Sequence, residues 1–168
     1  LHRGAVLAHP PLTLRDGAGR EKQAVLERRR EDYLSLYHRE REGDVVRILP
    51  SNVGYVDLDR LAFGEVDAMF ERLKSTRAIV FDMRGYPNDT FFVLAPRLTG
   101  ETRIAALIDT PLVGHGGATP AFESIAQTIE PASGEPYRGR TVMLIDERSM
   151  SQAEHMGLYL KAANGTTF

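Results

Sequence analysis

The sequence has no cysteine, no long apolar run and no excess of charge of one sign. Without cysteine the chain has no disulfide, no cysteine-bound zinc site and no thiol nucleophile, and its redox compartment cannot be inferred. No apolar stretch approaches the ~20 residues of a membrane-spanning helix, so we predict no membrane span. The 21 basic and 23 acidic residues leave a net charge of -2, which argues against a nucleic-acid partner.

The chain does have enough apolar material for one hydrophobic core. Its 168 residues are 42% hydrophobic and 26% charged, and this composition excludes a disordered tail. The first residues, Leu1-His2-Arg3, match neither a start at methionine nor a signal peptide. We therefore expect an internal piece of something longer, with no signal in this chain to fix its compartment.

The first quarter of the chain differs in composition from the rest. Residues 1–19 are rich in proline and glycine, which predicts a loop or a strand remnant. Residues 20–42 are dominated by charges with an incomplete apolar stripe, which predicts a solvated helix or connector. We place a domain boundary near residue 43, so that residues 1–43 are a connector or the remnant of a preceding domain.

Residues 44–168 carry the pattern of an α/β domain. Two β-rich runs, 45–49 and 53–58, flank a turn and precede a helix whose apolar residues recur at helical spacing. A fully apolar strand follows at 78–81, and the order strand, helix, strand predicts a parallel α/β unit. Further along we expect a short helix at 91–98, a strand at 103–109, a glycine-rich loop at 111–120, an irregular segment with a strand at 121–129, a strand at 142–145 and a helix to about residue 163.

Two strand ends carry the residues that suggest chemistry. Ligands of open α/β sheets gather beyond the carboxyl ends of strands, where this sequence has Asp82–Asn88 and Asp146–Ser151. Ser151 begins the next helix, where free N–H groups and the helix dipole stabilise negative charge. Ser151 therefore suits a nucleophile, with the amides of Gln152 and Gly85 as the two donors of an oxyanion hole.

Simpler interpretations of these residues remain open. The run from Ser151 to Glu154 is also a capping box, in which Ser151 caps the helix and Glu154 reaches back to its N–H. Gly85, which precedes Tyr86-Pro87, also fits an ordinary turn glycine. Spacing alone favours these structural roles over the catalytic ones.

Several segments together resemble one enzyme family. The segments are Gly54–Leu58, Ala78–Gly85, Gly139–Asp146 and Ser149–Glu154. Over about residues 45–168 they resemble the catalytic core of the C-terminal processing (tail-specific) serine peptidases, which include the tricorn core protease. In that family an Asp-x-Arg-x-Asn segment ends one strand and a Ser-x-Ser-x-(Ala/Ser)-Glu segment carries the nucleophile. The family's usual asparagine and paired glycines after the arginine are missing here.

The resemblance implies a fold and a set of roles. It implies an α/β fold with a crotonase-like (ClpP-like) ββα core, so that residues 44–168 would be part of a serine peptidase catalytic domain. Ser151 takes the place of the nucleophile, and Ser149 is the second choice. The amides of Gly85 and Gln152 take the place of the oxyanion hole.

The resemblance also implies what the protein acts on and where it works. The substrate would be a peptide or unfolded protein, bound extended beside a sheet edge and hydrolysed through an acyl-enzyme. The family is often exported, which favours the periplasm or the outside of the cell, and a homo-oligomer is compatible with it. No cofactor motif and no metal-ligand spacing occurs in the sequence, so we expect neither.

The general base lies outside this chain if the resemblance holds. The family uses a lysine that would fall beyond Phe168 or a histidine that would fall before Leu1. Within the chain, Lys161 lies ten residues along the helix from Ser151, roughly 15 Å away at the rise of an α-helix. His155 shares a helix face with Ser151 but is more often a surface or packing partner at this spacing. We therefore expect the isolated chain to be inactive or nearly so.

Two other functions fit the same pattern. One is a non-catalytic binding module on this fold, a role that the resemblance allows through the retinoid-binding repeats of the photoreceptor matrix and that suits Ser151 as a plain cap. The other is a crotonase-type acyl-CoA enzyme, which shares two oxyanion amides without a serine nucleophile. Gly114–Gly117 has the composition of an esterase oxyanion loop but lacks its sequence context, so we expect a mobile loop there.

Overall fold

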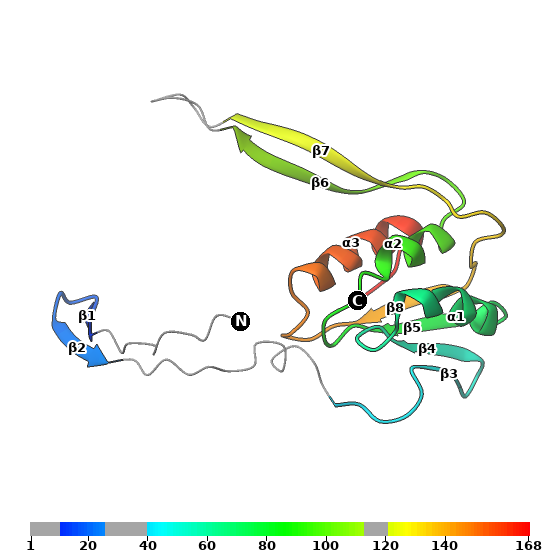
Figure 1. Cartoon of the computed structure of the whole chain (residues 1–168), viewed down its shortest axis with the longest axis horizontal. Helices are drawn as coiled ribbons and strands as arrows, with labels where there is room; N and C mark the ends of the chain where they lie inside the picture. Colours follow the sequence, from blue (N-terminus) through cyan, green and yellow to red (C-terminus); the bar gives the residue numbers. More distant parts are fainter. Residues whose placement is uncertain (1–10, 26–39, 113–120) are drawn as a thin grey trace, which may run out of the picture. The chain divides into compact units, whose positions relative to one another are not determined.

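The computed structural model describes residues 11–25, 40–112 and 121–168. The chain divides into two compact units, Leu1–Tyr33 and Leu34–Phe168, and each is described by itself. In the described residues the structure is mixed α/β, with one four-stranded sheet, two two-stranded sheets and three α-helices (Figure 1).

The first unit contains a β-hairpin. Strand β1 (Pro11–Arg15) pairs antiparallel with β2 (Glu21–Val25). Asp16 closes the turn between them, because its Oδ1 accepts the N–H groups of Ala18 at 2.9 Å and Arg20 at 3.0 Å. An aspartate that folds back on the following backbone is a common turn device.

This hairpin corrects one expectation. The strand remnant predicted in residues 1–19 agrees with β1, whereas the solvated helix or connector predicted for residues 20–42 is wrong over β2. The charges of β2 are typical of a solvated helix surface. They are exposed on a two-stranded sheet instead, and a short strand with no buried face has no alternation of apolar and polar residues to reveal it.

The second unit is built on a mixed sheet with strand order β3-β4-β5-β8. The antiparallel pair β3–β4 closes through the turn predicted between them, where Ser51 and Asn52 have φ of 65° and 55°. Strands β4, β5 and β8 are parallel, which confirms the predicted strand–helix–strand unit. The bounds are Val46–Leu49 for β3, Val53–Asp57 for β4, Ala78–Asp82 for β5 and Arg140–Leu144 for β8.

Three α-helices complete the described part of this unit. Helix α1 (Val66–Leu73) buries the apolar stripe predicted from its spacing, and α2 (Phe91–Leu94) continues into a 3-10 turn (Ala95–Arg97) that contains the expected proline. Helix α3 (Gln152–Asn164) lies beside α2 (Figure 1), with the Phe91 and Tyr159 rings in contact. No helix of the described residues is long and apolar enough to cross a membrane.

The core fills the space between this sheet and the helices. Its fully buried members come from the strands, from α1 and from α3, and they include Val56, Ile79, Phe81, Met143, Leu73, Ala153, Met156 and Leu160. Burial of these side chains stabilises the unit by about 1.5–3 kcal/mol for each large residue. The core thereby fixes the strand ends from which the predicted site is built.

A long, exposed hairpin projects from this unit (Figure 1). Strand β6 (Arg103–Leu112) pairs antiparallel with β7 (Ala121–Ile129), and apolar side chains such as Leu107 and Phe122 are more than half exposed on it. The strand expected within 121–129 is confirmed. The loop expected at 111–120 is wrong at its first two residues, which extend β6, and residues 113–120 lie outside the described residues, as does the expected Gly114–Gly117 loop.

Gly139, just before β8, leaves room for the buried ring of Tyr137. A Cβ built at this position would lie 2.1 Å from Tyr137 Oη, which bonds to Thr76 O at 2.9 Å and to Thr76 Oγ1 at 3.1 Å. We expect Gly139→Ala to displace this ring and lower the free energy of unfolding by about 2–3 kcal/mol, measured by urea denaturation. Gly64→Ala is the matched control, because nothing lies within 4 Å of its new Cβ; equal losses in both variants would contradict this account.

Candidate functional site

The two segments singled out from the sequence meet at one edge of the sheet. Strands β5 and β8 are parallel neighbours in register, with Asp82 opposite Leu144, so their carboxyl ends lie together. Beyond them, Ser149 Oγ donates to Met83 O at 2.8 Å. The Gln152 side chain donates to the Asp89 carboxylate. The loop after β5 and the loop after β8 are therefore bonded to each other.

Ser151 has an unusual backbone conformation. It is the N-cap of α3, with φ of 55° and ψ of -114°. This region is open to glycine and strained for residues with a Cβ, at a cost of order 1–3 kcal/mol. A strained serine on a sharp turn from a strand into a helix is also the geometry of a nucleophile elbow. Ser151 is exposed, so its hydroxyl is accessible.

One half of the capping box expected at this helix start, the bond to Glu154, is present. The Ser151 N–H donates to Glu154 Oε2 at 2.8 Å. The Ser151 side chain itself makes no cap hydrogen bond. The structural role and the nucleophilic role are therefore compatible, because Glu154 holds the Ser151 backbone while the hydroxyl remains unused.

The two predicted oxyanion donors differ in their present partners. Gln152 is the first residue of α3, and in the described part of the chain its N–H has no backbone acceptor, as is usual in a first helical turn. The Gly85 N–H donates to Met83 O at 2.8 Å. Gly85 must be glycine for steric reasons, because a Cβ there would lie 2.6 Å from Cγ of Asp59.

A buried charged cluster lies directly beneath these loops. Asp57 ends β4, Asp82 ends β5, and both are fully buried. Arg41 Nη1 lies 2.9 Å from Asp57 Oδ1 and 3.4 Å from Asp82 Oδ1. Arg84 donates to both oxygens of Asp82, at 2.9 and 2.7 Å, and Tyr55 donates to Oδ2 at 2.7 Å.

This cluster alters two pKa values. Burial by itself would raise the pKa of Asp82, but hydrogen bonds from Arg84 and Tyr55 together with the Arg41 charge outweigh it and lower the pKa to about 2. Burial, and then the hydrogen bond to Asp82, raises the pKa of Tyr55. Asp82 is therefore ionised and paired at neutral pH, which suits an anchor and not a proton carrier.

Sequence reasoning missed most of this cluster. Asp82 and Arg84 belonged to the family pattern, whereas Arg41 sat in a charged run interpreted as solvated connector. Its interleaved acidic neighbours gave it no distinguishing local signal. An arginine of a charged run shortly before an apolar strand is too common a feature to indicate a buried partner.

Neither candidate base inside the chain is placed to serve Ser151. The His155 ring bonds to the Gln127 side chain through Nε2 and packs against the Phe91 and Tyr159 rings, with centroids 5.2 and 5.1 Å away. Lys161 lies in the last turns of the same helix, roughly 15 Å along its axis from Ser151. His155 is thus a packing residue in this structure, as its spacing suggested.

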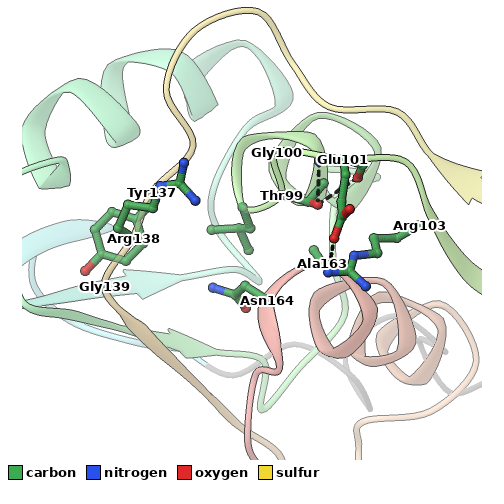
Figure 2. Close-up of a pocket in the computed structure, with 10 residues that line it drawn as sticks. Thr99, Gly100, Glu101, Arg103, Tyr137, Arg138, Gly139, Ala163 and Asn164 are labelled. Atoms are coloured by element: carbon green, nitrogen blue, oxygen red, sulfur yellow. Dashed lines mark hydrogen bonds and ion pairs between the residues drawn. The ribbon is translucent and has the colours of Figure 1, made fainter.

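Several cavities lie in the described part of this unit, and they differ in how close they lie to the predicted site. The polar cavity in Figure 2, of about 480 Å³, is lined by Thr99, Arg103 and Asn164 among others, at the end of α3 remote from Ser151. A smaller cavity of about 280 Å³ is lined by Ile145, Ser149, Glu154, Leu158 and Phe168 among others. The smaller cavity is the relevant one, since it lies beside the chemistry and its lining is mostly apolar.

No cluster of potential metal ligands occurs among residues 11–25, 40–112 and 121–168. The carboxylates that end β4 and β5, Asp57 and Asp82, are already paired with arginine side chains. What the arrangement offers chemically is an exposed serine at a helix start, in one of two loops that are hydrogen-bonded to each other.

Replacement of Ser151 tests the backbone strain. We expect Ser151→Gly to raise the free energy of unfolding by about 1 kcal/mol, because glycine adopts this φ and ψ without a Cβ clash but loses more backbone entropy on folding. Ser151→Ala keeps the Cβ and should bring no such gain. Equal stability of the two variants in urea denaturation would argue against a strained serine.

Acid titration tests the buried cluster. A folded-state pKa of about 2 for Asp82, below the ordinary value of 3.8 for an aspartate, contributes stability that is present above about pH 4 and lost as the pH falls towards 2. We expect Asp82→Asn to cost about 3 kcal/mol at pH 7 and progressively less below pH 4. The exposed Asp67→Asn is the control; a cost for Asp82→Asn that does not change with pH would contradict the assignment.

Comparison with known proteins identifies a similar fold. No protein-family model matches the chain, and no curated protein matches its sequence. Among solved structures, the chain is similar to a "putative peptidase" from Parabacteroides merdae ATCC 43184, with a TM-score of 0.59 and 16% sequence identity. The match covers 72% of this chain and 40% of that one. At this identity the likeness shows the fold alone, and in its fold the chain is similar to a peptidase.

Proposed function

We propose that this chain carries the nucleophile and oxyanion hole of a serine peptidase. The observation that carries the proposal is Ser151, an exposed serine in a glycine-like conformation on the turn from a parallel strand into a helix. Strain of this kind persists only where the surrounding structure holds it, and it concentrates at functional sites. The likeness in fold to a peptidase agrees with this proposal.

The proposed chemistry is acyl transfer. Ser151 Oγ attacks the peptide carbonyl, the C–N bond breaks, and the leaving amine takes a proton, which leaves an acyl-enzyme for water to hydrolyse. The N–H groups of Gln152 and Gly85 stabilise the oxyanion, the latter after leaving Met83 O. The Ser151 proton must pass to a general base, for which His155 and Lys161 are badly placed, so we expect slow reaction at neutral pH.

The proposed substrate is a peptide or an unfolded protein. The apolar cavity beside Ser149 and Glu154, of about 280 Å³, is suited to an apolar side chain next to the scissile bond. The finer assignment rests on the sequence pattern: a crotonase-like core of the C-terminal processing and tricorn peptidases, with Ser149 as the second-choice nucleophile. An exported location and homo-oligomers would follow from that assignment.

A non-catalytic binding module is the second candidate function. The observation in its favour is the Gly85 N–H, which is bonded to Met83 O in this structure and not directed at a ligand. In such a module Ser151 would serve only as the helix cap that Glu154 completes. The two candidates differ in whether the Ser151 hydroxyl reacts.

Covalent labelling distinguishes the two candidates. We expect a fluorophosphonate to label Ser151 slowly at pH 7 and about tenfold faster per pH unit up to pH 10, because without a positioned base the reactive alkoxide fraction grows with pH. Intact-protein mass spectrometry gives the rate, and peptide mapping gives the labelled residue.

Two variants complete this experiment. Ser151→Ala should abolish the label, and the exposed Ser133→Ala should react as the wild type does. Fast labelling of Ser151 at pH 7 would mean that a base is in place after all. Absence of any label on Ser151 up to pH 10, in a folded chain, would favour the binding module.

A further inference from the structure

The carbonyl of Met83 accepts two hydrogen bonds, one from each side of the site. Ser149 Oγ donates to it at 2.8 Å, and the Gly85 N–H donates to it at 2.8 Å. Met83 itself is fully buried. A carbonyl oxygen has two lone pairs, so Met83 O accepts both hydrogen bonds, and if one donor leaves, the other still satisfies it.

The Ser149 hydroxyl has no proton left for chemistry. Its oxygen accepts the Asp146 N–H at 3.1 Å, and its single hydrogen is directed at Met83 O, which can only accept. The first interaction lies within the turn that carries Ser151, and the second joins that turn to the loop after β5. The Ser149 side chain is therefore bonded to backbone groups of both loops, whereas Ser151 is exposed.

The Gly85 bond to Met83 is the weaker of the two by geometry. It joins residues two apart, and the N–H···O angle of such a three-residue turn is bent. Arg41 donates to Arg84 O, the carbonyl of the same planar peptide that carries the Gly85 N–H. Release of this N–H towards a substrate therefore requires the whole Arg84–Gly85 peptide to turn as a unit, which also changes the direction of the carbonyl that Arg41 holds.

We propose that Ser149 is a positioning residue that frees the Gly85 amide for the oxyanion hole, a role that rests on the proposed function of Ser151. When Gly85 N–H leaves Met83 O, the Ser149 hydroxyl keeps that buried carbonyl satisfied. Without Ser149 the same release would leave the carbonyl without a donor, which is costly in a buried setting. Ser149 lowers the cost of forming the oxyanion hole.

Nuclear magnetic resonance tests this role without reference to activity. Met83-Arg84 is the one Met-Arg pair in the sequence, so ¹³C-carbonyl methionine with ¹⁵N-arginine gives a single peak that reports on Met83 O. In Ser149→Ala we expect that peak to move upfield as one donor is lost. The Gly85 amide should exchange with solvent about tenfold more slowly, because it becomes the sole donor to the carbonyl.

Labelling of Ser151 tests the consequence for reactivity. At pH 9.5 we expect Ser149→Ala to react with the fluorophosphonate about tenfold more slowly than the wild type, with the label still on Ser151. Ser149→Thr keeps the hydroxyl at a position that lines the adjoining cavity, so it should restore both the amide exchange and the labelling rate. If Ser149→Ala does not fold, the near-isosteric Ser149→Cys, with its weak S–H donor, takes its place.

The outcomes separate this inference from the proposed function. A Gly85 amide that exchanges at the same rate in all variants would overturn the role of Ser149, even if Ser151 is labelled. A label on Ser149 itself would also overturn it. If Ser151 is not labelled but amide exchange at Gly85 slows as expected, the peptidase proposal is contradicted. The competition of two donors for Met83 O is then still supported.

Discussion

Two buried carboxylates on adjacent strands set the main constraint on this structure. Asp57 and Asp82 face each other in the register of β4 and β5, and both are fully buried. Two like charges at such a spacing repel strongly unless cations neutralise them. Arg41 bridges both carboxylates, and Arg60 and Arg84 each pair with one. Each carboxylate therefore has two arginine partners, and Arg41 is the one that both share.

The cluster matters because the loop after β5, which carries Gly85, is fixed to it. Arg41 also holds the carbonyl of Arg84, the residue before Gly85. The next turn is tied down as well, since Asp59 Oδ1 accepts the Tyr86 N–H at 3.0 Å. On the far side, Ser149 bonds the loop after β8 to the loop after β5. The two loops are thereby held in a fixed arrangement, which the proposed oxyanion hole would require.

Much of the fold was predictable because its signals are local. The spacing of apolar residues predicts α1, and continuous apolar runs predict β5 and β8. A proline-containing turn predicts the hairpin of β3 and β4. The hairpin of β1 and β2 and the extent of β6 were not predictable in the same way. Those strands are exposed on most of their surface, so burial imposes no periodic pattern on their residues. Their charged residues and prolines then suggest a helix or a loop instead of a strand.

The sequence by itself determined which residues stand at the strand ends and at the start of α3, because these depend on periodicity and on neighbours a few positions away. It left Ser151 as either a cap or a nucleophile, and Ser149 as a second serine of the same kind. Tertiary structure decided what distinguishes them: the backbone conformation of Ser151, the bonding of Ser149 to Met83, and the burial of Arg41 against two carboxylates. These depend on contacts between segments distant in sequence, which no local pattern encodes.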